Sequence, residues 1–115
     1  MRFNRFEDLV RGKKVYLSGP ITGVPNYKER FDEAERLLRK YGAIVINPTV
    51  LPLGLEYAEY LKINLAMVDA CQYVCMLPGW SDSRGAITEH VYGETMGKKI
   101  MYLNGLKTSR REKKI

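Results

Sequence analysis

The segment WSDSRGAITEH, residues 80–90, gathers several side chains that could do chemistry into one short stretch. An aspartate, two serines, an arginine and a glycine precede Glu89, and the apolar run YVCML stands just upstream. A carboxylate in a site can act as a nucleophile or as a general acid or base. A hydroxyl and an arginine ahead of a helix suit an anion. The segment therefore predicts a site with Glu89 as its reactive group and Ser83, Arg84 and Gly85 as an anion clamp.

Glu89 also has a purely structural interpretation. An acidic side chain in the first turn of a helix interacts favourably with the helix dipole. A capping box would need Ser, Thr, Asp or Asn three positions earlier, and Ala86 stands there. The patterning alone leaves both a catalytic role and a dipole role open.

A second polar loop follows the apolar run VYL in the segment VYLSGPITG. Its Ser18, Gly19, Thr22 and Gly23 let the backbone approach a ligand, and exposed N–H groups ahead of a helix suit a phosphate. The loop matches neither a Walker motif nor GxGxxG, which argues against a nucleoside triphosphate site. A glycine-bearing turn without a ligand is the alternative.

Four short apolar runs alternate with three helical patterns. Strands are expected at residues 14–19, 43–48, 72–78 and 98–103, and helices at 27–41, around Leu61 to Val68, and from about Ala86 to Met96. Near-continuous apolar strands belong to a parallel sheet covered by helices on both faces. Right-handed crossovers then predict the α/β class, with a small doubly wound (Rossmann- or flavodoxin-like) parallel sheet of about four strands flanked by helices.

Such a sheet binds ligands beyond the carboxyl ends of its strands. The loops after the first, second and third strands meet at that edge, and they are the loops rich in polar residues and glycine. We therefore expect Glu89 and its neighbours to face the SGPITG loop. Residues 14–103 would form this single domain, after an N-terminal extension with a short helix at residues 1–13 and before a basic tail at 104–115.

The formal net charge of +6 comes largely from that tail. A basic terminal run is usually solvated and sometimes makes a weak nucleic-acid contact. No apolar run approaches the ~20 residues of a membrane span, and the first residues lack a signal-peptide core. Cys71 and Cys75 lie in an apolar segment, as buried thiols of a reducing cytosol do. These features predict a cytoplasmic protein without cofactor or metal.

The segments VYLSGPITG, the NP that closes the second strand, DACQYVCMLPGWSDSRGAITEH and GKKIMYL together resemble the nucleoside 2-deoxyribosyltransferase superfamily. They are most similar to its branch of short phage and bacterial proteins of unassigned function, over residues 14–103. In the characterised members, a glutamate at the start of the helix after the third strand attacks C1′ of a deoxynucleoside and expels the base. The resemblance implies Glu89 as this nucleophile, Tyr16 as its hydrogen-bond partner and Asp82 as the acid near the sugar or base.

Relatives that hydrolyse deoxynucleoside 5′-monophosphates imply a phosphate site built from Ser18, Gly19, Pro20 and Ser83. Asn64 stands where the transferases carry an aspartate for the base. An amide can hydrogen-bond a base but cannot deliver a proton, which favours hydrolysis over base exchange.

Several aromatic side chains have two interpretations each. Trp80 either stacks on a nucleobase or covers the sheet edge, and Tyr57 and Tyr60 either line a base pocket or reach a neighbouring subunit. His90 is expected at the surface or at an interface. Because superfamily members are commonly dimers or larger, the resemblance implies a homo-oligomer.

Three functions follow from these observations. The first is N-glycosidic bond cleavage or transfer on a 2′-deoxynucleoside 5′-monophosphate or related nucleoside. The second is a catalytically silent module of the same fold that binds or sequesters a nucleotide. The third is a nucleic-acid-associated protein that uses the basic tail.

Overall fold

Four parallel strands form one sheet in the order β2-β1-β3-β4. The structure is a computed structural model and describes residues 9–104. The strands are β1 (Lys14–Ser18), β2 (Ile44–Ile46), β3 (Tyr73–Met76) and β4 (Lys99–Tyr102), and the helices are α2 (Tyr27–Lys40), α3 (Tyr57–Asp69) and α4 (Arg84–Thr95), with short 3-10 helices η1 (Pro48–Val50) and η2 (Trp80–Asp82). The predicted order of strands and helices is confirmed.

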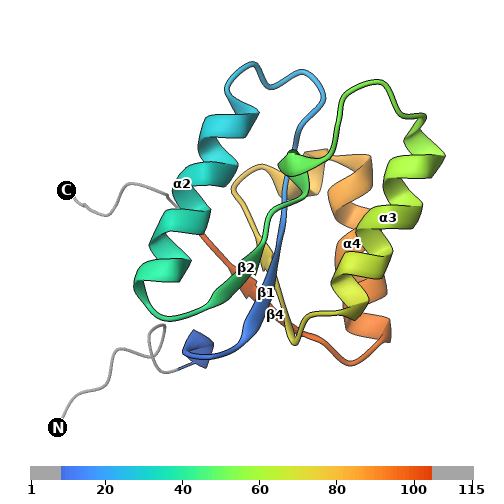
Figure 1. Ribbon diagram of the computed structural model, residues 1–115. Helices are drawn as coiled ribbons and strands as arrows, with labels where there is room; N and C mark the ends of the chain where they lie inside the picture. The colour runs from blue at the N-terminus through green and yellow to red at the C-terminus, as the bar shows by residue number, and fades with distance from the viewer. Residues whose placement is uncertain (1–8, 105–115) are drawn as a thin grey trace, which may run out of the picture.

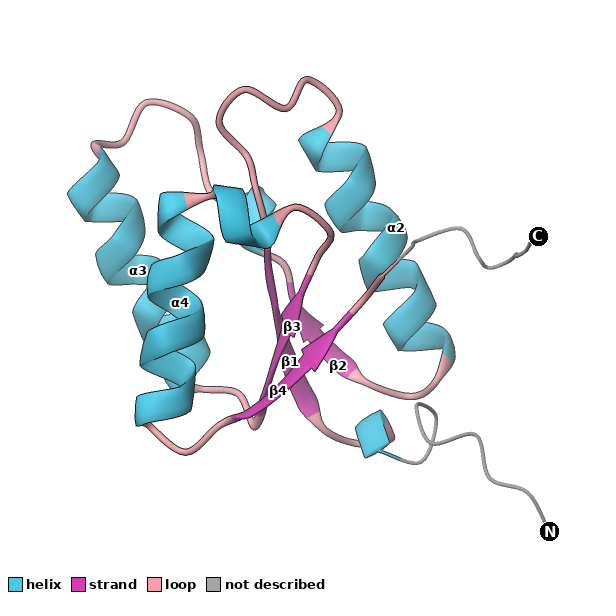
Figure 2. Cartoon of the chain, turned by 180° about the vertical axis from the view of Figure 1, so that it is seen from behind, coloured by secondary structure: helices cyan, strands magenta, loops and turns pink. Residues whose placement is uncertain are grey.

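The helices cover both faces of the sheet. Helix α2 packs on one face, while α3 and α4 lie side by side on the other (Figures 1 and 2). The chain moves from β1 to β2 in one direction along the sheet and then back across β1 to β3 and β4. Because each crossover is right-handed, this reversal moves the later helices to the opposite face. The predicted doubly wound α/β fold is therefore confirmed, and its order reverses at β1 and β3.

The alternation of side chains along β1 assigns each residue to one of two cores. Val15 and Leu17 pack in the core that includes Phe31 of α2. Tyr16 points the other way, into the core that includes Ala86 of α4. Successive side chains of a strand face opposite sides of the sheet, so Tyr16 and Ser18 both face α3 and α4. This parity decides which residues of β1 reach the site.

The two cysteines are free and buried, as expected. Burial raises the pKa of the Cys75 thiol to about 12 and that of Cys71 to about 11. In the part of the chain that the structure describes, no helix is both long and apolar enough to cross a membrane. Most of the predicted N-terminal extension and all but the first residue of the basic tail lie outside the described residues.

Candidate active site

Glu89 of α4 accepts hydrogen bonds from three side chains, two of them from β1 and one from α3. Tyr16 Oη donates to Glu89 Oε2 at 3.0 Å, and Ser18 Oγ donates to Oε1 at 2.6 Å. Asn64 Nδ2 of α3 donates to Oε2 at 3.1 Å. The two bonds from β1 follow from strand parity, and the third follows from the packing of α3 against α4. Together they fix the orientation of the carboxylate.

The Glu89 side chain is almost fully removed from solvent, with 5% exposure. Burial raises the pKa of Glu89 above its usual value, while the hydrogen bonds from Ser18, Tyr16 and Asn64 act in the opposite direction. Burial, together with the nearby Glu89 carboxylate, raises the pKa of Tyr16 well above its ordinary range. Tyr16 therefore stays protonated and donates a hydrogen bond to Glu89.

A pocket of about 210 Å³ opens above Glu89 at the carboxyl edge of the sheet. Its walls come from the loop after β1, the start of α2, the η1 segment, α3 and the start of α4. The ligand edge expected of a doubly wound sheet is thus also where the structure has a cavity. The predicted residues that line it are Tyr16, Gly19, Asn64, Ser83, Gly85 and Glu89.

Gly19 directly follows β1, at a point where the loop after β3 passes close by. A Cβ atom at this position would lie 2.9 Å from Leu77 Cβ, closer than such atoms approach one another. Glycine is therefore required here for packing between the two loops that border the pocket.

Helix α4 begins at Arg84, two residues before the predicted start, because Ser83 caps it. The Ser83 side chain accepts a hydrogen bond from the backbone N–H of Ala86 at 3.2 Å. The expectation that Glu89 lies in the first turn is therefore wrong; it lies in the second. Since the dipole effect fades within the first turn, the helix dipole does not explain this glutamate.

Five of the predicted site residues do not line the pocket. Ser18 is buried in β1 and reaches the site only through its hydrogen bond to Glu89. Asp82 lies in η2 and is exposed. The Pro20 ring lies close to Gly79 in the loop after β3. Trp80 is stacked on His90, with ring centroids 4.5 Å apart and planes 2° from parallel. This places Trp80 at the sheet edge near β4, which is one of its two predicted positions.

The last of the five, Arg84, lies beside the pocket wall. Its guanidinium carbon is 4.8 Å from the centre of the Tyr57 ring, a cation–π geometry. Tyr57 itself lines the pocket, as does Tyr60, whose hydroxyl donates to the carbonyl of Pro52 at 2.6 Å. Both tyrosines therefore line the pocket.

The sequence interpretation missed the wall formed by α2 and η1. Tyr27 and Phe31 of α2 line the pocket, as do Pro48 and Thr49 of η1. The helical spacing of Phe31 indicated a core residue, and it is in fact 1% exposed. A helix face that is buried near a ligand edge cannot be told from ordinary core by its periodicity.

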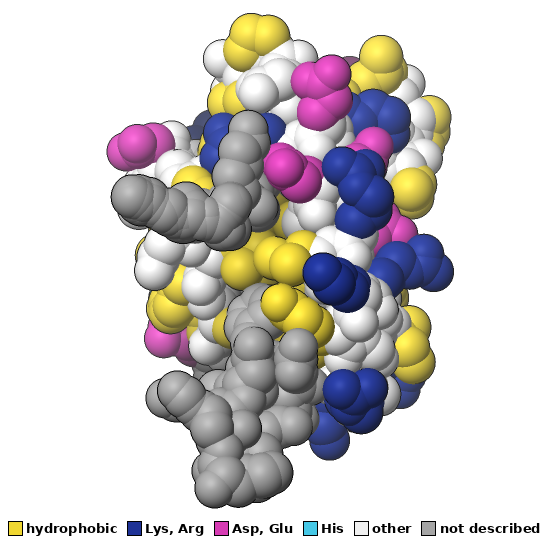
Figure 3. All heavy atoms as spheres, turned by 90° about the vertical axis from the view of Figure 1, so that its left-hand side faces the viewer, with side chains coloured by type: hydrophobic (Ala, Val, Ile, Leu, Met, Phe, Trp, Pro, Cys, Tyr) yellow, Lys and Arg dark blue, Asp and Glu magenta, His cyan; other side chains and the backbone are white. Residues whose placement is uncertain are grey.

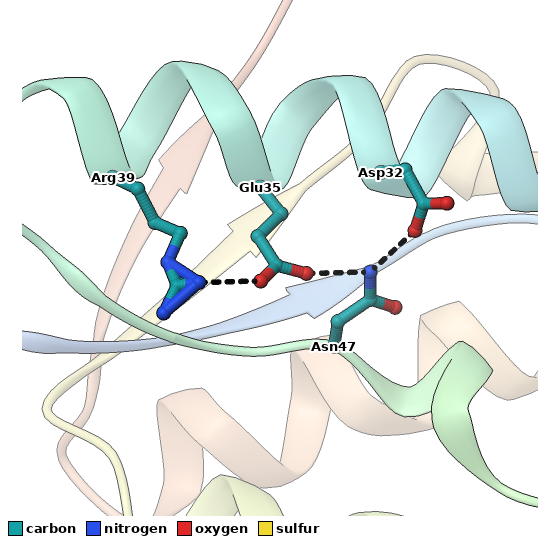
Figure 4. A network of polar contacts seen from close by, with 4 residues as sticks. All are labelled: Asp32, Glu35, Arg39 and Asn47. Atoms are coloured by element: carbon teal, nitrogen blue, oxygen red, sulfur yellow. Dashed lines mark hydrogen bonds and ion pairs between the residues drawn. The ribbon is translucent and has the colours of Figure 1, made fainter.

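Asn47 ties this wall to α2 (Figure 4). Its Nδ2 donates to Asp32 Oδ1 at 3.1 Å and to Glu35 Oε1 at 3.0 Å. Its Oδ1 accepts from the backbone N–H and the hydroxyl of Thr49 at 2.9 and 2.7 Å. The NP pair that closes the second predicted strand was the signal for this residue, since an Asn before Pro often starts a turn.

Basic side chains lie on the surface and not in the pocket. On the face that carries α2, Lys and Arg side chains gather along one side (Figure 3). Among the described residues that line the pocket there is no Lys, Arg or His. Within residues 9–104 no group of His, Cys, Asp and Glu side chains is arranged to hold a metal ion.

A family model and a solved structure are similar to this chain. A family model described as "Domain of unknown function (DUF4406)" matches residues 13–102. The solved structure of a 2-desoxiribosyltransferase from Leishmania mexicana is similar, with a TM-score of 0.65 and 18% identity. The match covers 80% of this chain and 64% of that one, and at this identity it shows the fold alone. No curated protein matches the chain.

Proposed function

This chain belongs to the DUF4406 family, and we propose that it breaks the N-glycosidic bond of a nucleoside or nucleotide with Glu89 as the nucleophile. The observation that carries the proposal is the buried Glu89 carboxylate, which three donors orient at the base of the pocket. The likeness in fold to a 2-desoxiribosyltransferase supports it.

The reaction uses the carboxylate twice. A Glu89 oxygen forms a bond to C1′ while the C1′–N bond breaks, and the electron pair of that bond passes to the base. Water then attacks C1′, releases the sugar and frees the carboxylate, and its proton passes to solvent. A free base in place of water would give transfer. The buried negative charge stabilises the oxocarbenium-like transition state of both steps.

The two carboxylate oxygens are not equivalent. Oε2 accepts from both Tyr16 and Asn64, while Oε1 accepts from Ser18 alone. A carboxylate oxygen has two lone pairs, so Oε1 has one left to attack. Tyr16, Ser18 and Asn64 are positioning residues in this scheme. The Ser18 hydroxyl hydrogen-bonds the Glu89 carboxylate, so we assign it to that group and not to a substrate phosphate.

A 5′-phosphate has support at the start of α4. Ser83 and Gly85 line the pocket there, and Arg84 lies beside its wall. Helix N-termini favour anions, so monophosphates belong among the substrates to be tested. Asp82, which is exposed outside the lining, has no part in the proposed reaction.

The test is a chromatographic screen of common deoxynucleosides, ribonucleosides and their 5′-monophosphates, with and without an acceptor base. Wild type is compared with Glu89→Gln and with Glu94→Gln, an exposed glutamate of the same helix. We expect free base from wild type and Glu94→Gln, and none from Glu89→Gln. Equal release by all three proteins would refute Glu89 as the nucleophile. Ligand binding with no product from any substrate would instead favour the silent binding module.

A further inference from the structure

We propose that the pocket selects N-glycosides whose base carries a positive charge, such as pyridinium or N7-alkylated purinium nucleosides. This inference rests on the proposed function and names the substrate class. It is carried by the charge of the pocket lining, by its aromatic side chains and by the lack of a second carboxyl group or a histidine among the described lining residues.

Among the described residues that line the pocket, Glu89 is the one charged side chain, and no cationic side chain of the lining pairs with it. Glu89 is the only Asp or Glu among those residues, and none of them is Lys or Arg. Its three partners, Tyr16, Ser18 and Asn64, are all neutral donors. A buried charge without a counter-ion is costly. A cationic ligand would supply the counter-ion, and a neutral ligand would not.

Aromatic side chains surround the space above the carboxylate. Tyr27 and Phe31 reach it from α2, and Tyr57 and Tyr60 reach it from α3. The faces of such rings attract cations, an effect that strengthens when water is excluded. One ring already shows this behaviour, because the Arg84 guanidinium lies over Tyr57 at 4.8 Å. A flat cationic base would find the same interaction inside the pocket.

A neutral base must gain a proton as it leaves, and apart from Glu89 the described lining holds no carboxyl group and no histidine to supply one. Asn64, which hydrogen-bonds Glu89, carries an amide and cannot deliver a proton. The Tyr16 hydroxyl is already bound to Glu89. A cationic base needs no proton, because the electron pair of the broken C1′–N bond neutralises its ring nitrogen and it departs as a neutral molecule. The site can therefore complete this reaction with the groups that it has.

The first test compares 7-methyl-2′-deoxyguanosine with 2′-deoxyguanosine, which differ by the methyl group that charges the base. Rates are corrected for spontaneous loss of base, with Glu89→Gln as the blank. We expect kcat/KM to be at least about 100-fold higher for the methylated substrate, the low end of what general acid catalysis contributes. Nicotinamide 2′-deoxyriboside, run beside them, separates pyridinium from purinium preference.

Asn64→Asp tests the reason for the selectivity. It would place a second carboxyl beside Glu89, and two carboxyl groups at that distance share a proton. We expect kcat/KM of the variant to rise at least about tenfold on 2′-deoxyguanosine. On the methylated substrate it should not rise. An unchanged ratio between the two substrates in a folded variant would overturn the role of Asn64.

Binding gives a test that needs no turnover. 1-Methylnicotinamide is a cation and nicotinamide is its neutral counterpart, and neither has a glycosidic bond. By calorimetry we expect wild type to bind the cation about tenfold more tightly, within the range of a desolvated cation–π contact. Tyr27→Leu should reduce that preference, and Tyr102→Leu, which changes an aromatic ring outside the pocket lining, should not.

The two proposals can fail separately. If wild type cleaves neutral nucleosides as fast as cationic ones, the proposed function stands and the charge preference is overturned. If no nucleoside is cleaved, the proposed function fails, and the binding pair then decides the charge preference. Equal affinity for 1-methylnicotinamide and nicotinamide would overturn it.

Discussion

Tyr16 and Glu89 are 73 positions apart in the sequence, and they meet with Tyr16 Oη 3.0 Å from Glu89 Oε2. One comes from the central strand β1 and the other from helix α4, whose second turn packs against it. Both side chains are buried. A hydrogen bond between a phenol and a carboxylate in such surroundings is stronger than its equivalent in water. This contact joins the sheet to the reactive group of the proposed site.

Replacing Tyr16 by Phe should slow turnover and change its pH dependence. The substitution keeps the volume of the ring and removes one donor to Glu89. A hydrogen bond to a charged group is worth about 1.5–3 kcal/mol, so we expect kcat to fall about tenfold or more. Loss of the donor also raises the pKa of Glu89 further, which moves the acidic limb of the kcat/KM profile to higher pH. A rate profile measured from about pH 4 to 8 checks both.

Tyr92→Phe is the matched control, because it removes the bond from an exposed tyrosine hydroxyl to Asp69. It should leave the profile unchanged. A profile that shifts equally in both variants would contradict a special role for Tyr16.

Ser18→Ala distinguishes a carboxylate partner from a phosphate partner. Ser18 Oγ lies 2.6 Å from Glu89 Oε1. If the hydroxyl orients the carboxylate, its loss should lower kcat by about the same factor for a nucleoside and for its 5′-monophosphate, roughly tenfold for a charged hydrogen bond. Steady-state kinetics on the pair measures this. A rise in KM confined to the monophosphate would assign Ser18 to the phosphate instead.

Glu89 should make the folded protein less stable as the pH rises. Its pKa in the folded state lies above the usual 4.5 because of burial, so folding favours the protonated form. The contribution of this group to the free energy of unfolding is therefore full below about pH 4.5. It is lost as the pH rises through the folded-state pKa, with a slope of at most about 1.4 kcal/mol per pH unit.

Urea unfolding of wild type and Glu89→Gln across this range measures that contribution. The variant cannot ionise, so its stability relative to wild type should increase with pH. Glu94→Gln should show no such trend, since Glu94 is exposed. A stability difference between Glu89→Gln and wild type that does not change with pH would contradict a raised pKa for Glu89.

Asn47→Ala should loosen the η1 wall of the pocket. The substitution removes two donors to the carboxylates of α2 and the acceptor for Thr49. Asn47 is 5% exposed, so we expect a loss of about 1–3 kcal/mol in the free energy of unfolding and a higher KM. Arg39→Ala breaks only the surface pair with Glu35 and should cost less than about 1 kcal/mol. Similar losses in both variants would show that Asn47 has no special structural role.

Much of this fold could be predicted from the sequence because its elements carry strong local patterns. The β1 run of apolar residues and the helical spacing of Phe31, Ala34 and Leu38 each correspond to the observed elements. The pairing of Tyr16 with Glu89 came from the resemblance, since no local pattern joins residues so far apart. The parity of β1 then explains why Tyr16 faces the site and Leu17 does not.

The rest depended on contacts that the sequence does not encode locally. The Trp80 ring stacks on His90. From the sequence alone, this contact cannot be distinguished from a tryptophan that stacks on a bound nucleobase. The exposed position of Asp82 depends on the η2 turn that precedes α4. The Asn47 network joins a loop to α2 through side chains, and short polar contacts of this kind leave no periodic signal.

Trapping the glycosyl-enzyme tests the role of Glu89 as nucleophile most directly. Wild type is mixed with a substrate that it cleaves and denatured within the first turnovers, and its peptides are mapped by mass spectrometry. We expect a single added sugar on the Glu89 side chain, found in the peptide that contains it, and no added mass in Glu89→Gln. A sugar on another residue, or wild-type turnover by Glu89→Gln, would contradict that role.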